Sequence, residues 1–406
     1  MPTTMLDFTS ALYLGLEHSS ASLPGWKQFT LGKPAALESP PGAEEVARDL
    51  AELQNCESAT LGPSTLHLFL DLFEVLARRN ISVFMDSEAY SIARRGVERA
   101  AAQRVPVKLF PHHSAHALRV EVAQSCGPRR SPVVVTDGVC PQCNRVAPLD
   151  EYLDLARNGR GWLVVDDTQA LGILGERPGV GSPYGWRGGG SSRWLSIQGP
   201  ELLLVSSLAK GFGAPIAALA GTRTLVDGFV RESSTFAHCS PPSIPAIAAA
   251  ASALEINRQF GDLLRQRLLS RVRRLRRGLA RVGLSAATPG LFPVQSFHLP
   301  TSAEPLALHT ELLRRGIVTI PQQLPGARRA RLAVLLNARH TTEHIDQLVE
   351  ELAGLLQTCG PNLTLKQKVE GFAEAPIEVR PSFICQLAGS AVRPMFNIPR
   401  TTQTPY

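Results

Sequence analysis

The stretch that decides the fold of this chain is Glu201-Leu-Leu-Leu-Val-Ser-Ser-Leu-Ala-Lys210-Gly-Phe-Gly213. Its apolar run, 202–205, is short and follows Gly199-Pro200, which predicts a buried strand ending just before the lysine. Lys210 is one of six lysines among 42 basic residues. A lysine amine, unlike a guanidinium, can lose its proton and attack a carbonyl group. Taken alone, the pattern favours a surface cation after a strand.

A second apolar run, 162–165, ends in the carboxylates Asp166 and Asp167. Side chains that follow the strands of an open parallel sheet collect at one edge of that sheet. We therefore expect Asp166 and Lys210 to share a site. Pyridoxal phosphate (PLP) chemistry uses this pair, because a lysine binds the cofactor aldehyde and a carboxylate keeps the ring nitrogen protonated.

Apolar runs and amphipathic segments alternate along most of the chain, which predicts an α/β fold with βαβ units and a mainly parallel sheet. The expected strands are 58–61, 81–85, 105–110, 131–136, 162–166, 202–205 and 216–221. The expected helices are 43–53, 66–76, 149–156 and 245–257. A further amphipathic helix over 264–282 carries eight arginines, on a face that we expect to be solvated. The Gly-rich stretch 178–192 predicts a flexible surface hairpin.

Several short motifs occur in a fixed order and together resemble those of one family. They are Leu12-Tyr-Leu-Gly-Leu, Asp137-Gly-Val, Ala147-Pro-Leu, Val165-Asp-Asp, Leu171-Gly-Ile-Leu-Gly, Leu208-Ala-Lys-Gly-Phe-Gly and Arg331-Leu…His340-Thr. The chain resembles the α-oxoamine synthase group of fold-type I PLP enzymes, and in pattern the 8-amino-7-oxononanoate synthases most of all. The match extends from residue 5 to residue 357.

The resemblance implies a fold-type I PLP-dependent transferase with a large domain and a small one. The large PLP-binding domain, 41–240, should hold a mainly parallel seven-stranded sheet flanked by helices. Residues 1–40 should join the small α/β domain, which spans 241–358. The proline-rich extension 359–406 reads as partly disordered or as wrapping the surface.

The resemblance also implies roles for individual residues. Lys210 would form a Schiff base with the cofactor and act as acid and base at the substrate α-carbon, while Asp166 would hold the ring nitrogen and Tyr90 would cover the ring. The other expected cofactor-binding residues are Ser64, Thr65, Asp137, Gln169 and Ser207, and Arg331 is the expected substrate-binding residue.

Three positions depart from the family pattern. Gln169 stands where the family has a histidine that hydrogen-bonds the cofactor ring oxygen, and an amide cannot titrate. Tyr90 stands near the place of a histidine that stacks on the ring, and its own aromatic face can do the same. Ala333 occupies the position of an arginine that clamps the substrate carboxylate, and alanine cannot replace that contact.

These observations predict a PLP-dependent transferase that acts on an amine or amino-acid substrate. The chemistry stays open between transamination, as in class I/II aminotransferases, and condensation with an acyl thioester. The resemblance also implies a homodimer. The alternative of another class is a protein that keeps the fold but has no turnover, and serves as a partner or carrier-binding subunit. The paired Asp166 and Lys210 argue against that alternative.

Composition bounds the remaining possibilities. The net charge is +7, yet no aromatic residues interleave with the arginines, so we expect no nucleic-acid partner. No apolar run is long enough for a membrane span, and no secretory signal precedes the seven cysteines, which favours the cytoplasm. Cys140-Pro-Gln-Cys143 supplies half of a zinc site and has no second pair. We expect this loop, and the neighbouring pair His112-His113, to be structural and metal-free.

Overall fold

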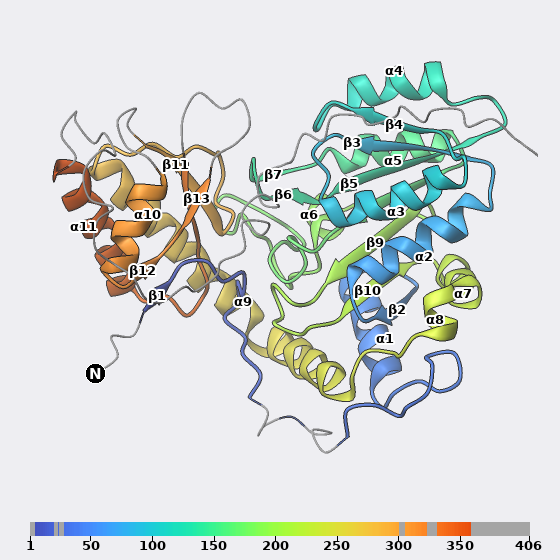
Figure 1. Ribbon diagram of the computed structural model, residues 1–406, viewed down its shortest axis with the longest axis horizontal. Helices are drawn as coiled ribbons and strands as arrows, with labels where there is room; N and C mark the ends of the chain where they lie inside the picture. Colours follow the sequence, from blue (N-terminus) through green and yellow to red (C-terminus); the bar gives the residue numbers. More distant parts are fainter. Residues whose placement is uncertain (1–4, 20–22, 24–27, 300–304, 323–330, 359–406) are drawn as a thin grey trace, which may run out of the picture.

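The computed structural model describes residues 5–19, 23, 28–299, 305–322 and 331–358 (Figure 1). Its main element is a seven-stranded sheet in the order β2-β10-β9-β8-β5-β3-β4. Within this sheet only β10 runs antiparallel to its neighbours, so the predicted mainly parallel sheet is confirmed. The strands are β2 (Ser58–Gly62), β3 (Ile81–Asp86), β4 (Val107–Phe110), β5 (Ser131–Asp137), β8 (Trp162–Asp166), β9 (Leu202–Ser207) and β10 (Ala217–Gly221).

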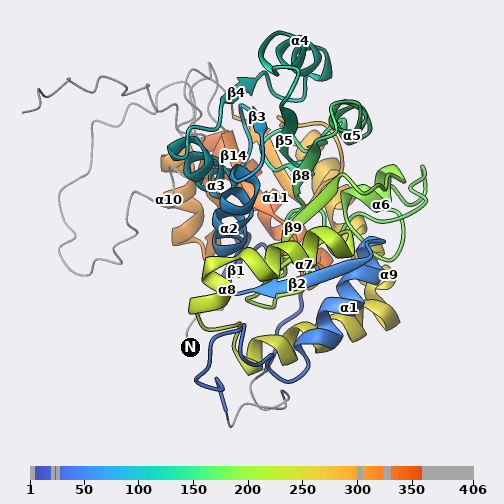
Figure 2. The same cartoon turned by 90° about the vertical axis from the view of Figure 1, so that its right-hand side faces the viewer.

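Helices cover both faces of the large sheet. Successive strand residues point to opposite faces, so in β5 Val133 and Val135 pack in one cluster with α2 and α3, whereas Val134 packs in another with α4 and α5. Figure 2 shows the sheet between α2–α3 and α5–α6. The helices of this part are α1 (Ala43–Gln54), α2 (Thr65–Ala77), α3 (Ser91–Ala102), α4 (Ala115–Ser125), α5 (Leu149–Asn158), α6 (Ser191–Leu195), α7 (Arg223–Glu232) and α8 (Ser234–His238).

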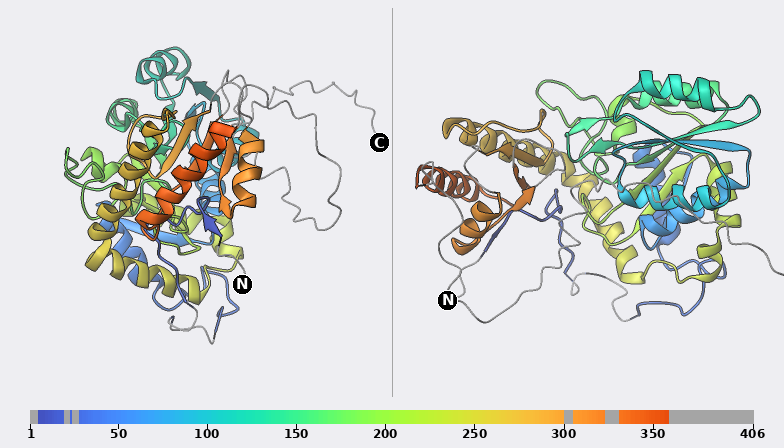
Figure 3. Two further views of the ribbon diagram at one scale, coloured as in Figure 1. Left: turned by 90° about the vertical axis from the view of Figure 1, so that its left-hand side faces the viewer. Right: turned by 45° about the horizontal axis from the view of Figure 1, so that its top comes forward.

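A single 38-residue helix, α9 (Ile244–Arg281), replaces the two helices expected over 245–257 and 264–282. The helix begins at Ser243, whose hydroxyl accepts a hydrogen bond from the Ala246 N–H, and Pro245 lies in its first turn. It runs without interruption from the large sheet to the smaller part of the molecule (Figures 1 and 3). The two parts therefore share one continuous helical element.

The arginine-rich face of α9 is not uniformly solvated, contrary to the expectation. Arg265 is 2% exposed, and its Nη1 donates to the carbonyl of Gly172 and to Oδ1 of Asn257, both at 2.8 Å. Its Nη2 donates to Asp262 at 2.6 Å. These acceptors satisfy a guanidinium that would be costly to bury alone. The hydrophobic periodicity of the helix could not predict the burial of Arg265, because Gly172, which accepts its hydrogen bond, lies far away in the sequence.

The smaller part is built on a three-stranded antiparallel sheet in the order β11-β14-β13, with α11 packed against α9. Near the N-terminus, β1 pairs with β12 in parallel, so the first described residues join this part. The domain boundaries stay a prediction, and 359–406 lies outside the described residues. The remaining elements are β1 (Leu6–Asp7), β6 (Val139–Cys140), β7 (Arg145–Val146), β11 (Val294–His298), β12 (Ile317–Val318), β13 (Ile320–Gln322), β14 (Arg331–Leu335), α10 (Pro305–Arg314) and α11 (Thr342–Thr358).

Among the described residues, none of the helices is both long and apolar enough to cross a membrane.

Candidate active site

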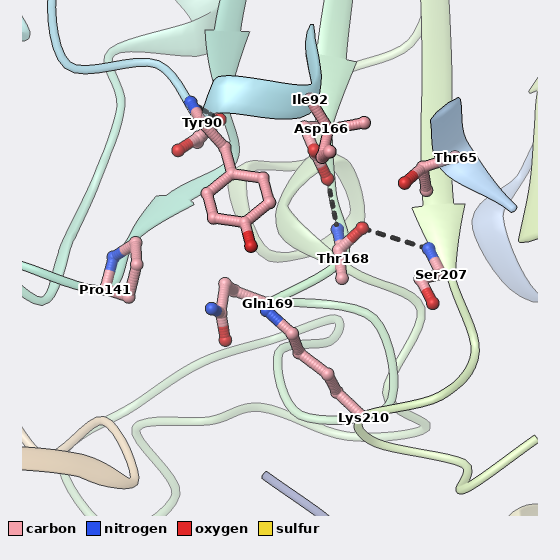
Figure 4. Close-up of a pocket in the computed structure, with 10 residues that line it drawn as sticks. Thr65, Tyr90, Ile92, Pro141, Asp166, Thr168, Gln169, Ser207 and Lys210 are labelled. Atoms are coloured by element: carbon pink, nitrogen blue, oxygen red, sulfur yellow. Dashed lines mark hydrogen bonds between the residues drawn. The ribbon is translucent and has the colours of Figure 1, made fainter. Parts of the chain in front are cut away.

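The carboxyl ends of three neighbouring parallel strands meet at one cavity. Asp137 ends β5, Asp166 ends β8 and Ser207 ends β9, and the first turns of α2 and α3 add residues from the opposite side. The cavity has a volume of about 200 Å³ (Figure 4). Its lining residues are Thr65, Tyr90, Ile92, Asp137, Pro141, Asp166, Thr168, Gln169, Ser207 and Lys210. The fold thus gathers seven of the nine expected site residues.

A tight turn after β9 presents Lys210 to the cavity. Gly213 has a φ of +64°, and a Cβ at this position would collide with the carbonyl of Leu16. The carbonyl of Phe212 lies 2.9 Å from Nε2 of His18. Only glycine fits both this backbone conformation and this close approach. The glycines of the opening stretch therefore place the lysine on a fixed turn that is held against the N-terminal segment.

Lys210 and Tyr90 face each other in the cavity, as Figure 4 shows. The Lys210 Nζ lies 5.6 Å from the centre of the Tyr90 ring. Tyr90 immediately precedes α3, and its backbone N–H donates to Oδ1 of Asp137 at 3.1 Å. Tyr90 is 37% exposed. One of its faces is available to a planar ligand.

Burial and opposite charges act against each other on the titratable groups. Burial lowers the pKa of Lys210, while the charges of Asp166 and Asp137 raise it. Burial raises the pKa of Asp166, and hydrogen bonds from Thr168 with the charge of Lys210 lower it. The pKa of Asp137 lies well above its usual range, because of burial and then the Asp166 charge. A buried amine with a lowered pKa is the usual form of a nucleophilic lysine.

Thr168 connects two of the expected residues but was not itself among the expected site residues. Its backbone N–H donates to Oδ1 of Asp166 at 3.1 Å, which is the pattern of an Asx turn. Its hydroxyl accepts the Ser207 N–H at 2.9 Å (Figure 4). The sequence signal for this turn is an aspartate, Asp166, followed two residues later by a threonine.

Gln169 is oriented by a residue from the N-terminal segment. The Tyr13 hydroxyl donates to Oε1 of Gln169 at 2.7 Å, and burial raises the pKa of Tyr13, which keeps it a donor. With its oxygen occupied, the amide retains its N–H groups as donors toward the cavity. Tyr13 belongs to a motif quoted above, but its role could not be predicted because the contact joins residues 156 positions apart.

Asp167 is not part of the cavity and instead holds the loop before α6. It is fully buried, and Oδ1 accepts the hydroxyl and the backbone N–H of Ser191. Burial raises the pKa of Asp167 to about 7. A Cβ on Gly138 would collide with its carboxylate. Gly190 lies against this carboxylate, and Gly188 and Gly189 before it are also buried. The expectation of a flexible surface hairpin over 178–192 is therefore wrong at its C-terminal end.

Two expected site residues do not line the cavity. Ser64 directly precedes α2, and its hydroxyl lies 2.9 Å from Nδ1 of His67. Arg331 begins β14, and its buried Nε has no hydrogen-bond partner among the described residues. Ala333, two residues on, is fully buried and faces the same side of the strand as Arg331. The expected roles of Ser64 and Arg331 stay predictions.

Comparison with known proteins shows the family and the fold to which this chain belongs. Residues 5–352 match the family model described as aminotransferase class I and II. The 8-amino-7-oxononanoate synthase of Methylococcus capsulatus is 32% identical over 310 residues, which cover 75% of this chain and 75% of the relative. A structure of 8-amino-7-oxononanoate synthase from Francisella tularensis has a TM-score of 0.68 at 18% identity, covering 87% of this chain and 98% of the other. A high-resolution structure of SPT with PLP has a TM-score of 0.77 at 16% identity, covering 88% of this chain and 89% of the other.

The fold and the residues gathered at the strand ends define a fold-type I PLP-dependent transferase. The chain belongs to the class I and II aminotransferase family and is related to the 8-amino-7-oxononanoate synthases. The donor set of the cavity fits PLP, since it offers a buried amine, a carboxylate, hydroxyl groups and an aromatic face. The fold, cofactor and enzyme class expected from the sequence are therefore confirmed.

Proposed function

We propose that this enzyme condenses a small amine or amino acid with an acyl thioester, in an acyl-transfer reaction like that of its synthase relatives. The observation that carries the proposal is the placement of Lys210 in the cavity, opposite Tyr90 and beside Asp166. The relationship to 8-amino-7-oxononanoate synthases favours acyl transfer over transamination. The retained pairing of amine and carboxylate argues against a protein without turnover.

In this proposal each part of the PLP cofactor is bound by different residues of the cavity. Lys210 holds the aldehyde end, Asp166 holds the ring nitrogen, and Tyr90 covers one face of the ring. Thr65 and Ser207 bind the phosphate, because the Ser207 hydroxyl accepts the Ala209 N–H and so keeps its own proton to donate. PLP, when bound, supplies an aldehyde for amines and a ring that withdraws electrons from the substrate α-carbon.

The protein's own residues then move protons and orient the substrate. Lys210 is the group within the cavity whose lowered pKa suits the transfer of a proton to and from the α-carbon. Asp166 keeps its orientation through Thr168, which it meets by a backbone hydrogen bond. Gln169 donates an amide N–H to the cofactor ring oxygen, with its other end fixed by Tyr13. Asp137 fixes the position of Tyr90 through the backbone.

The substrate side differs from that of a typical amino-acid enzyme. Ala333 offers no donor to an α-carboxylate, and we propose that Arg331 provides the positive charge on this face of β14. An amine without an α-carboxylate is the other substrate that fits an alanine at this position. The enzyme is further proposed to work as a homodimer, and the cytoplasmic location stays a prediction from the sequence.

The proposal is tested by incubating the PLP-loaded enzyme with a panel of acyl-coenzyme A thioesters and small amines. Free coenzyme A and the coupled product are measured together by liquid chromatography and mass spectrometry. We expect both to appear with at least one pair of substrates and to vanish in Lys210→Ala but not in Lys108→Ala, which changes an exposed lysine on β4. Amino transfer to a keto acid without release of coenzyme A would instead show an aminotransferase.

A further inference from the structure

A cluster of histidine and cysteine side chains lies beside the cavity but outside the chemistry described so far. His112 comes from the turn after β4, and Cys140 and Cys143 come from the β6–β7 hairpin. The ligating atoms of these three residues all lie within 4.8 Å of one another. His112 Nε2 is 3.4 Å from the Cys143 Sγ. Figure 1 shows the hairpin at the end of the large sheet that faces β11 and β13.

A buried carboxylate orients the His112 ring toward the thiols. Asp86 is 1% exposed, and its Oδ1 lies 2.8 Å from Nδ1 of His112. The same carboxylate accepts the backbone N–H groups of Glu88 at 2.9 Å and His113 at 3.0 Å, which fix its position. With Nδ1–H donating to Asp86, the lone pair of Nε2 points at the cysteines. A carboxylate behind a histidine is the usual support of a metal-ligating imidazole.

The backbone around the cysteines resembles a metal-binding knuckle rather than a redox motif. The Asn144 N–H donates to the Cys140 carbonyl at 2.8 Å, and Asn144 has a φ of +57°, so the two cysteines sit within a tight hairpin. A helix N-terminus is one of the features that lower the pKa of a reactive cysteine and make it redox-active. Here the next helix, α5, begins only at Leu149. Paired cysteines two residues apart are typical zinc ligands.

His113 lies against His112 and does not point away from it. Its φ of +55° turns the side chain back, so that its ring stacks on that of His112 with 3.7 Å between the centres. The His113 Nε2 is buried and has no hydrogen-bond partner among the described residues. An unpaired buried nitrogen is costly, and a bound ion or its water would satisfy it.

We propose that His112, Cys140 and Cys143 bind a zinc ion, with the fourth tetrahedral position left to water or His113. Two sulfurs and one imidazole form a soft donor set that favours zinc. Binding displaces the two thiol protons. No metal was expected from the sequence, because Cys140-Pro-Gln-Cys143 has no second cysteine pair, whereas the fold supplies a histidine as the further ligand.

The proposed ion would act on the enzyme through Pro141. This residue lies between the two cysteines and lines the cofactor cavity. A zinc ion that closes the hairpin would fix this wall of the cavity without touching the substrate. The inference does not depend on which reaction the enzyme catalyses, because the ligands and the hairpin lie outside the residues that hold the cofactor.

The test is metal analysis of the untagged, PLP-loaded full chain, purified in a reductant from zinc-supplemented medium. We expect one zinc ion per chain, lost in Cys143→Ser and His112→Ala. The matched controls Cys126→Ser and His116→Ala change the same residue types outside the cluster and should keep the ion. Asp86→Asn should weaken zinc binding about 10- to 100-fold, as loss of a supporting carboxylate does.

A second measurement avoids variants that fail to fold. The wild-type protein is stripped with a chelator, checked by circular dichroism, and titrated with Co²⁺ alone, which should give the visible bands of a tetrahedral sulfur-ligated ion. Zinc retained in Cys143→Ser, or no tetrahedral cobalt spectrum in the folded wild type, would overturn the proposal. So would a metal-free protein whose intact mass shows a Cys140–Cys143 disulfide.

Discussion

Burial lowers the pKa of Lys210, whereas the charges of Asp166 and Asp137 raise it. We expect Lys210→Ala to abolish covalent attachment of PLP and to lower turnover by at least about 10²-fold, because the variant loses both the nucleophile and the acid–base group. Borohydride reduction followed by intact mass spectrometry measures the attachment. Lys108→Ala serves as the control and should retain the mass increase. If the cofactor is still fixed in Lys210→Ala, the assignment of this lysine is wrong.

The pH dependence of cofactor attachment follows from the same charges. Only the neutral amine attacks an aldehyde, so the rate at which the stripped enzyme takes up PLP should rise with pH through the pKa of Lys210. Burial lowers that pKa, and the negative charge of Asp166 raises it again. Asp166→Asn removes the charge, so the pKa falls and the rise should move to lower pH. Stopped-flow absorbance at a series of pH values checks the direction, and an unmoved or alkaline-shifted profile would contradict it.

The alanine at position 333 affects how tightly the enzyme binds a ligand with an α-carboxylate. Where an arginine clamps the carboxylate, the contact is worth about 1.5–3 kcal/mol, or ten- to a hundredfold in affinity. Ala333 lacks this contact and Arg331 is the proposed substitute, so we expect the PLP-loaded enzyme to bind alanine more tightly than ethylamine, which lacks the carboxylate, in absorbance titrations. Arg331→Ala should remove this preference and leave the two ligands with similar weak affinity. Tight binding of alanine that survives in Arg331→Ala would show that this interpretation is wrong.

At the scale of elements, α9 is held in place by Arg265, which was expected on the solvated face of the helix but is buried. Arg265→Ala leaves the Gly172 carbonyl and the Asn257 amide oxygen without their donor and opens a cavity. We expect a loss of about 2–4 kcal/mol in stability, since buried acceptors that lose a charged donor cost this much. Thermal unfolding should show a Tm lowered by several degrees. Arg267→Ala, an exposed position on the same helix, is the control and should change little.

The helices and strands also show which features of the fold could be predicted from the sequence and which could not. Apolar periodicity located the strands of the large sheet because each is decided by a few consecutive residues, as in β8 and β9. Lys210 and Asp166 could be paired because parallel strands end at one edge. The burial of Arg265, the contact from Tyr13 to Gln169, and the approach of His112 to Cys143 depend on segments that meet only after folding. Periodicity within one segment carries no information about such contacts.

At the scale of the whole molecule, one edge of the large sheet, formed by β2, borders a groove. A groove of about 1190 Å³ runs beside β2, the edge strand, between the segment 35–40, α1 and α7. Leu37 in this groove is 75% exposed. An unpaired sheet edge beside exposed apolar side chains is a surface that proteins normally cover. Two-fold homodimers are the commonest oligomers, and they use the same surface on both subunits.

We therefore expect the enzyme to form a homodimer through this groove. Light scattering after size exclusion should give twice the chain mass of 43.8 kDa. Leu37→Asp places a charge where the partner would bury an apolar side chain, so it should shift the equilibrium toward the monomer at micromolar concentration. Val180→Asp is the matched control, because Val180 is 99% exposed on a loop away from the groove. A wild-type enzyme that is monomeric and fully active would refute the dimer, and a dimer unaffected by Leu37→Asp would place the interface on another face.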